Sequence, residues 1–263
     1  MYSRIWLRPD GTPQLVEAAL DRAAGTVDFA GRNRTVEQLD AGIPVDGTVY
    51  GTLLNFRGTL AALGEAMRQP PYKEPPKAPV LYLKPWNTWR RCGDTIPVPE
   101  GVEALEMGGT LGVVIGRDAR RVREADALDH VAGYVVVNDV TIPHASLHRP
   151  SIRQRCQDGF CPIGPWVAAR ADVGDPGDLE IRIHVDGELR ARNTTANLVR
   201  PLACLLAEVT AFMTLSAGDV LLVGLPDNAP EARAGQTVRV EIDGVGWTEN
   251  RLVPAREPEG ERP

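Results

Sequence analysis

Proline and glycine divide this chain into short segments, and that division limits what it can fold into. The 263 residues contain 22 prolines and 26 glycines, which leave little room for long uninterrupted helices. Between these turn residues, six segments are rich in β-branched residues and are predicted to be strands. They are residues 80–84, 111–116, 134–141, 179–187, 219–224 and 237–246. The sequence therefore predicts a mainly β protein.

Helical periodicity is confined to three stretches, residues 58–69, 123–133 and 195–213. The first fifty residues differ from the rest and suggest two hairpin-like pieces. We expect an α+β fold, mainly β with a few helices, in three parts. These are a small N-terminal β cap (1–46), a strand-dominated core (47–253) and a charged flexible tail (254–263).

Charge and composition exclude several classes of function. The formal net charge of −6 argues against a surface that binds nucleic acid or an anionic membrane. No apolar run approaches the length of a membrane span. The polar first ten residues lack the features of a signal peptide, and the four cysteines form no CxxC pair. We expect a cytoplasmic protein.

Several blocks between residues 51 and 253 resemble the fumarylacetoacetate hydrolase family in order and spacing. They include "GTLLNFRGTLAAL" (51–63), "VLYLKPWNT" (80–88), "TLGVVIGRDARRVREADALDHVAGYVVVNDVT" (110–141) and "MTLSAGDVLLVGLP" (213–226). The resemblance implies a mixed-β roll that assembles as dimers or larger oligomers. It also implies a divalent metal, Mg²⁺ or Mn²⁺, which stabilises the enolate formed from a 2-oxo acid.

Two further blocks, residues 70–88 and 153–166, are similar to the first half of the two-part isomerase/decarboxylases of 4-hydroxyphenylacetate degradation. The resemblance implies a subunit that decarboxylates 5-oxopent-3-ene-1,2,5-tricarboxylate or isomerises 2-hydroxyhepta-2,4-diene-1,7-dioate. It leaves open which step this chain performs. The alternative is a metal-free, catalytically degenerate partner that supports a metal-bearing second-half subunit.

The metal ligands that the family supplies are incomplete here. Hard divalent cations prefer oxygen ligands, which the family provides as Glu-x-Glu on one strand and an aspartate on the next. In this sequence Gly108 and Thr110 take the two glutamate positions, and only Asp139 remains. Glu106 is an alternative ligand, although it lies about 6–7 Å further along the strand. We therefore expect metal binding to be weak or absent.

Other positions of the family's chemistry have changed as well. The His-x-x-Glu positions read Thr59 and Ala62, the hydroxyl of a Gly-Thr-Pro turn is replaced by Leu225, and a lysine is replaced by Arg155. What persists is a set of groups that suit a polycarboxylate 2-oxo acid. We predict catalytic roles for Arg155, Lys84 and His148, and substrate contacts for Asn87, Thr88, Arg149 and Arg153. For Arg149 and Arg153, exposure to solvent is an equally simple explanation.

Overall fold

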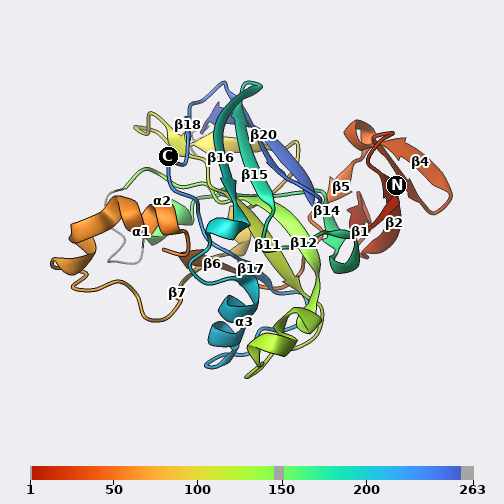
Figure 1. The fold of residues 1–263 in the computed structure, drawn as a ribbon. Helices are drawn as coiled ribbons and strands as arrows, with labels where there is room; N and C mark the ends of the chain where they lie inside the picture. Colours follow the sequence, from red (N-terminus) through yellow and green to blue (C-terminus); the bar gives the residue numbers. More distant parts are fainter. Residues whose placement is uncertain (1, 145–150, 256–263) are drawn as a thin grey trace, which may run out of the picture.

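The framework of the computed structural model, which describes residues 2–144 and 151–255, is a large mixed sheet (Figure 1). Its strand order is β4 (Arg32–Thr35), β3 (Thr26–Phe29), β2 (Val16–Asp21), β1 (Tyr2–Pro9), β14 (Trp166–Ala169), β12 (Val131–Asn138), β11 (Gly109–Ile115), β17 (Val220–Leu222), β6 (Val49–Leu53) and β7 (Val80–Lys84). Three short strands also belong to this sheet but lie outside that order. They are β5 (Ala41–Gly42), which pairs with β1, β13 (Cys161–Ile163), which pairs with β12, and β8 (Trp89–Arg91), which pairs with β13.

A second sheet packs against the middle of the first. Its order is β16 (Glu188–Thr194), β15 (Glu180–Val185), β19 (Thr237–Ile242), β20 (Gly246–Pro254) and β9 (Thr95–Val98). In β15 the side chains of Ile181, Ile183 and Val185 are buried while the residues between them are half-exposed, as expected for a strand with one face in the core. A two-stranded ladder, β10 (Leu105–Glu106) with β18 (Glu231–Ala232), lies outside both sheets.

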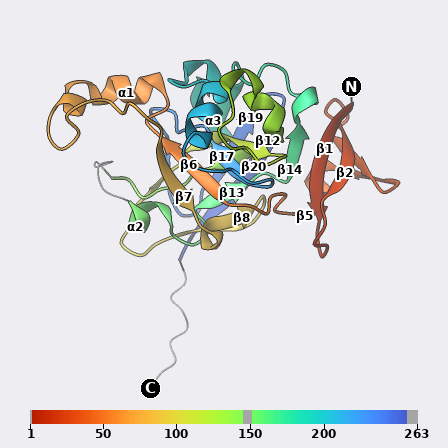
Figure 2. The same ribbon diagram turned by 90° about the horizontal axis from the view of Figure 1, so that it is seen from below.

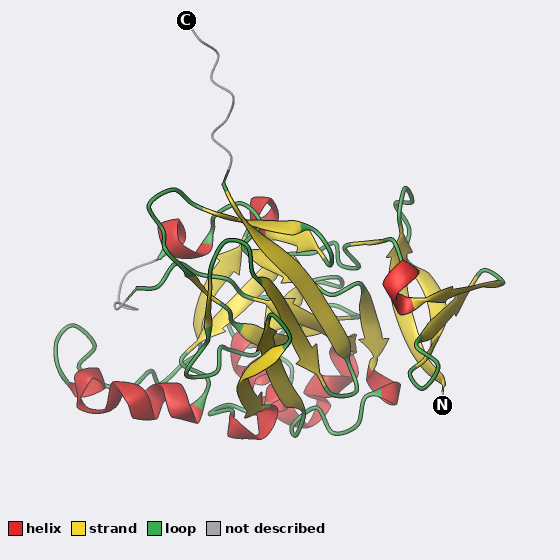
Figure 3. Cartoon of the chain, turned by 90° about the horizontal axis from the view of Figure 1, so that it is seen from above, coloured by secondary structure: helices red, strands yellow, loops and turns green. Residues whose placement is uncertain are grey.

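The helices are short and lie around the strands (Figure 3). The α-helices are α1 (Arg57–Leu63), α2 (Ile152–Arg155) and α3 (Leu202–Thr210). The 3₁₀ turns are η1 (Val36–Gln38), η2 (Gly64–Arg68), η3 (Trp86–Thr88), η4 (Glu124–His130), η5 (Arg170–Asp172) and η6 (Thr195–Asn197). Within the described ranges, no helix has the length and apolar character needed to cross a membrane.

The mainly β fold that the sequence predicts is confirmed, and all six predicted strands are present. Two helical predictions are wrong in detail. The predicted helix over 195–213 begins only after Pro201, because proline cannot donate an amide hydrogen and disfavours helical geometry at the residue before it. The stretch 124–130 forms a 3₁₀ turn that leads directly into β12.

The N-terminal strands continue the main sheet. Strand β1 pairs antiparallel with β14, with Ile5 opposite Ala168, and β2, β3 and β4 follow it outward at one side of the molecule (Figures 1 and 2). The division into a cap (1–46), a core (47–253) and a tail (254–263) stays a prediction.

The two central strands explain where the candidate site lies. Every residue of β11 is buried, as are nearly all of β12, which fits strands covered on both faces and read as continuous apolar runs. They pair antiparallel, with Gly109 opposite Asn138. Consequently the end of β12, where Asn138 and Asp139 follow the valines, is deep inside the molecule.

Candidate active site

A buried carboxylate forms the centre of the candidate site. Asp139 follows β12 directly and is fully buried. Its amide donates to the Gly108 carbonyl at 2.8 Å. Its side chain lies 2.6 Å from Lys84 Nζ through Oδ1, and its Oδ2 accepts a hydrogen bond from the Tyr82 hydroxyl. The carboxylate that the sequence analysis singled out is therefore held between a cation and a phenol.

The ammonium group of Lys84 is fully engaged. Besides the ion pair with Asp139, Nζ donates to three backbone carbonyls, those of Val140 (3.0 Å), Arg155 (2.7 Å) and Phe160 (2.8 Å). An ammonium has three hydrogens, so four acceptors already compete for them. Lys84 thus joins β7, the end of β12 and α2 around Asp139. Its predicted catalytic role stays a prediction, and none of its hydrogens is free for a ligand.

Arg155 supplies a second cation to the same cluster. It is buried at the end of α2, which lies beside the β7 end of the sheet (Figures 1 and 2). Its Nη1 lies 3.6 Å from Asp139 Oδ2, and its guanidinium carbon is 4.9 Å from the centre of the Tyr82 ring. Across the described part of the chain, Nε and Nη1 have no hydrogen-bond acceptor. The guanidinium therefore retains unused donors in a buried place.

Sequence reasoning missed Tyr82. Burial, and secondarily the negative charge of Asp139, raise the pKa of its phenol well above the ordinary value, while Arg155 opposes the shift. A phenol with this pKa stays protonated and donates to Asp139 at any physiological pH. The alternation of a strand was the available signal, because it places residues 82 and 84 on one face of β7.

The cluster does not fit a divalent metal. An added Cβ at Gly108 would lie 2.5 Å from the Asp139 carbonyl oxygen and 2.6 Å from Leu225 Cδ2. The Thr110 hydroxyl donates to the Gly224 carbonyl at 2.6 Å. No group of three or more histidine, cysteine, aspartate or glutamate side chains that could hold a metal occurs among residues 2–144 and 151–255. Since Asp139 is also paired with Lys84, the donor set offers one carboxylate that already has partners.

Asn55, from the "LNF" block, holds the turn that contacts Thr110. This buried amide donates to the carbonyls of Val223 (2.7 Å) and Arg200 (3.2 Å) and accepts from the Arg200 amide (2.9 Å). The neighbouring Gly224 has φ +130°, a conformation that favours glycine. Asn55 therefore links the loop at Arg200 to the loop at Gly224.

Replacing Asn55 by alanine is expected to lower the free energy of unfolding by about 2–3 kcal/mol, because stranding a buried backbone group costs about 1–3 kcal/mol. Urea unfolding measures it. Asn197→Ala is the matched control, since Asn197 is exposed and its side chain donates to Asn193 Oδ1 on the surface. Equal midpoints for Asn55→Ala and the wild type would contradict this role.

The remaining predicted residues fall into three groups. Asn87 Nδ2 donates to the Cys156 carbonyl (2.9 Å) and to Asp158 Oδ1 (2.8 Å), and the buried Thr88 hydroxyl donates to the Pro85 carbonyl (2.6 Å). The Asn87 contacts connect the η3 turn with the segment after α2, whereas the Thr88 bond lies within that turn. Arg153 is exposed on α2. His148 and Arg149 lie outside the described residues, and their predicted roles stay predictions.

Two further groups near the end of β12 are Glu106, which the sequence analysis names only as an alternative metal ligand, and His144. Glu106 on β10 is half-buried, and its backbone pairs with Thr141, two residues beyond Asp139. Burial raises the pKa of the Glu106 carboxyl, while the positive charges of His144 and Arg155 partly oppose this. His144 Nδ1 lies 2.9 Å from the Ile142 carbonyl. The backbone pairing thus holds Glu106 against the segment that follows Asp139.

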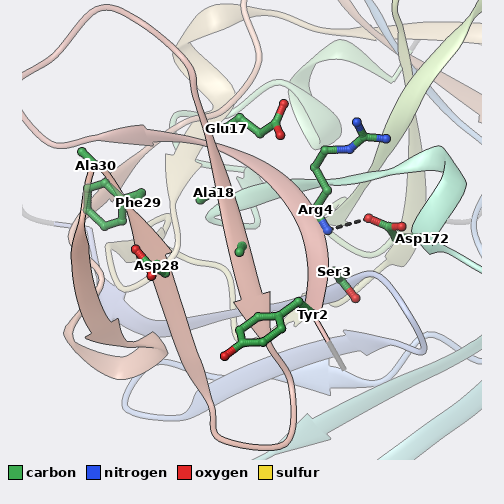
Figure 4. Close-up of a pocket in the computed structure, with 10 residues that line it drawn as sticks. Tyr2, Ser3, Arg4, Glu17, Ala18, Asp28, Phe29, Ala30 and Asp172 are labelled. Carbon is green, nitrogen blue, oxygen red and sulfur yellow. Dashed lines mark hydrogen bonds between the residues drawn. The ribbon is translucent and has the colours of Figure 1, made fainter.

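An open hollow on the N-terminal strands is a separate feature (Figure 4). Arg4, Glu17, Asp28 and Asp172 line it, and the Arg4 amide donates to Asp172 Oδ2 at 2.5 Å. It lies towards the opposite end of the main sheet from β7. It contains none of the residues selected from sequence.

Comparisons with known proteins agree with the fold and the motifs. The family model for the fumarylacetoacetate (FAA) hydrolase C-terminal region matches residues 48–253. The chain is 41% identical over 211 residues to the 4-hydroxyphenylacetate degradation bifunctional isomerase/decarboxylase of Escherichia coli, a match that covers 80% of this chain and 48% of the relative. The chain thus spans about half the length of that curated relative.

Solved structures extend the match to nearly the whole chain. The 5-carboxymethyl-2-hydroxymuconate delta-isomerase of Mycobacterium smegmatis superposes with a TM-score of 0.75 at 26% identity, covering 98% of this chain and 100% of that one. A Sphingobium maleylpyruvate hydrolase, solved with manganese and pyruvate, has a TM-score of 0.77 at 20% identity, over 96% of this chain and 100% of that one. At that identity the likeness concerns the fold.

The mixed-β architecture is that of a class of proteins that includes an isomerase/decarboxylase and a delta-isomerase. The chain belongs to the fumarylacetoacetate hydrolase family. Members of this family use Mg²⁺ or Mn²⁺. In this chain, by contrast, the residues around Asp139 fit a metal ion poorly.

Proposed function

We infer that this chain is a subunit of a 5-oxopent-3-ene-1,2,5-tricarboxylate decarboxylase / 2-hydroxyhepta-2,4-diene-1,7-dioate isomerase, and that it handles its 2-oxo polycarboxylate without a metal of its own. The 41% identity to an isomerase/decarboxylase over 80% of the chain supports the reaction class. The observation that carries the proposal is the buried Arg155 guanidinium, which has two nitrogens without acceptors beside Asp139.

The chemistry follows from charge. When a 2-oxo acid loses CO₂ or tautomerises, negative charge develops on the oxygen of the former keto group, and a preorganised cation stabilises that charge strongly in a buried site. Arg155 keeps its charge at all relevant pH values and matches carboxylate geometry. In the proposal Arg155 binds the substrate's oxygens, while Lys84 holds Asp139 and α2 in position. Contacts of substrate with Asn87, Thr88, Arg149, Arg153 and His148 remain part of the proposal.

Arg155→Gln is expected to lower kcat/KM for the tricarboxylate about 10- to 100-fold. A hydrogen bond to a charged group contributes about 1.5–3 kcal/mol, and 1.4 kcal/mol corresponds to a factor of ten. Spectrophotometric turnover, with and without a chelator, measures the change. Arg170→Gln is the matched control, because Arg170 pairs with Asp129 on the surface.

Two outcomes would count against the proposal. Turnover at the wild-type rate by Arg155→Gln would show that Arg155 does not bind the substrate. Complete loss of wild-type turnover in the chelator, restored by Mn²⁺, would remove the metal-free mechanism.

A second candidate function has its own support. Because the described residues hold no three-ligand metal group, the chain fits a catalytically degenerate partner that supports a homologous, metal-bearing second-half subunit. The chain alone would then be inactive, and mixing it with that subunit would raise the subunit's activity.

We also propose that the chain forms a homodimer, and size-exclusion chromatography with light scattering tests this. The proposed cytoplasmic location is tested by cell fractionation.

A further inference from the structure

The charged groups around Asp139 do not balance. Lys84 and Arg155 are cations and Asp139 is an anion, and all three side chains are buried. Within the described ranges, Asp139 is the only carboxylate within 4.0 Å of Arg155, and Lys84, at 2.6 Å, already matches its charge. The cluster therefore keeps a net positive charge. A buried charge without a counter-charge is costly, so an anion bound at Arg155 would complete the cluster.

Arg155 stops short of Asp139. Its Nη1 lies 3.6 Å from Asp139 Oδ2, which is beyond hydrogen-bond range, and neither Nη1 nor Nε has an acceptor in the described part of the chain. A guanidinium ordinarily forms two parallel hydrogen bonds to a carboxylate, at about 2.7–2.9 Å. Another group must therefore keep Arg155 from closing this gap.

The phenol of Tyr82 takes the place that Arg155 would occupy. Its hydroxyl donates to the same oxygen, Asp139 Oδ2. Its ring lies against the guanidinium, whose carbon is 4.9 Å from the ring centre, a distance typical of cation–π contacts. A guanidinium held by its face keeps the N–H groups of its plane available to other acceptors. Tyr82 thus blocks Asp139 and supports Arg155 at the same time.

Gly51 provides the space for this ring. It lies opposite Tyr82 in the pairing of β6 with β7. A Cβ added at Gly51 would overlap the Cζ and Cε2 atoms of Tyr82, so the ring lies directly over the bare backbone of the glycine. The position of the phenol therefore depends on the absence of a side chain at residue 51.

We propose that Tyr82 is a positioning residue that keeps Arg155 unpaired, so that its guanidinium is free to bind the oxygens of a 2-oxo acid. This inference rests on the proposed function and explains why Arg155 is available for it. Without the hydroxyl, Arg155 moves the remaining distance to Asp139 Oδ2, and its charge is neutralised within the protein. Tyr82 acts through Arg155 and needs no contact with the substrate.

Ligand affinity tests this role without requiring turnover. The probe is 2-oxoglutarate, titrated by calorimetry into the full chain in the presence of a chelator. The wild type should bind it, and Tyr82→Phe, which removes only the hydroxyl, should weaken binding at least about 10-fold, since a hydrogen bond to a charged group contributes about one to two orders of magnitude in affinity. Equal affinities for the wild type and Tyr82→Phe overturn the proposal, as does the absence of binding to the wild type.

A second variant reaches the same result by another route. Gly51→Ala keeps the phenol but displaces the ring, so it should also weaken binding, and wild-type affinity in this variant overturns the role of the ring position.

The chain offers two matched controls. Tyr134→Phe removes the hydroxyl of another buried tyrosine, which has no hydrogen-bond partner among the described residues. Gly174→Ala adds a Cβ where no atom lies within 4 Å. Both controls should bind 2-oxoglutarate as the wild type does.

A double variant separates positioning from a general loss of stability. Because Tyr82 acts through Arg155, Tyr82→Phe combined with Arg155→Gln should bind no more weakly than Arg155→Gln alone. Additive losses overturn the proposal. In a crystal structure of Tyr82→Phe, the distance from Arg155 Nη1 to Asp139 Oδ2 should shorten from 3.6 Å to about 2.8 Å, and an unchanged distance overturns the assignment.

The proposed function is tested separately on the same samples, by CO₂ release from the tricarboxylate. A chain whose binding of 2-oxoglutarate depends on Tyr82 but which releases no CO₂ retains this inference and loses the decarboxylase activity. A chain that releases CO₂ and binds equally well as wild type and as Tyr82→Phe retains the activity and loses the inference.

Discussion

Lys84→Met is expected to lower the free energy of unfolding by about 3–5 kcal/mol, because removing one partner of a buried ion pair leaves the other charge uncompensated. The methionine keeps most of the length of the side chain, so little of the loss comes from an empty space. It leaves the Asp139 carboxylate without its nearest cation and removes a donor from three backbone carbonyls, of which that of Phe160 keeps the Val140 amide. Guanidinium chloride unfolding, followed by circular dichroism, measures the change.

A surface pair provides the control for Lys84. Arg170 and Asp129 lie 3.1 Å apart with both side chains largely exposed, and exposed pairs contribute about 0–1 kcal/mol. Arg170→Met should therefore shift the midpoint little. If Lys84→Met were no more destabilising than Arg170→Met, Lys84 would not be the residue that holds Asp139 in place.

Restoring the two glutamates at positions 108 and 110 is expected to destabilise the chain without creating a metal site. In the Gly108→Glu, Thr110→Glu variant, the new Cβ at 108 would meet the Asp139 carbonyl oxygen at 2.5 Å. This oxygen belongs to the backbone, which the hydrogen bond from the Asp139 amide to the Gly108 carbonyl holds against position 108. The variant also loses the hydrogen bond from Thr110 to Gly224. Overpacking costs about 1–3 kcal/mol and burying a polar group adds to this, so we expect a loss of about 3–5 kcal/mol in unfolding free energy.

Calorimetric titration with Mn²⁺ completes this experiment. We expect no tight binding to the wild type or to the double variant, because Lys84 continues to occupy Asp139. Gly174→Glu is the control for stability: no atom lies within 4 Å of an added Cβ there, and such surface changes stay within about 0.5 kcal/mol. A double variant that is as stable as the wild type and binds Mn²⁺ one-to-one would contradict this prediction, because Asp139 would then be able to ligate a metal.

The strands could be predicted because their signal is local. In "VLYLK" and "LEIRIHV", β-branched and aromatic residues at alternating positions favour a strand whatever the rest of the chain does, and both segments form strands. The helical stretch 195–213 was less predictable. Its periodicity continues through Pro201, and the local geometry of that proline decides where the helix begins.

The residues of the site were predictable only in part. Motif order identifies Asp139, Lys84 and Arg155, and the structure brings these three together. Tyr82 escaped, and Glu106 was named only as an alternative metal ligand, because nothing in the chain order shows that β7, β10 and the stretch after β12 come together. That meeting depends on strand pairing between residues far apart in sequence, such as Glu106 with Thr141.

By itself, the sequence determined the strand-rich fold, the membership in this family and the absence of carboxylates at positions 108 and 110. Each of these depends on residue identity and on local pattern. Only the tertiary structure decided that the ammonium of Lys84 is shared among four acceptors and that Arg155 keeps unused donors. The physical reason is that charge, burial and hydrogen-bond partners are set by which segments the fold places in contact.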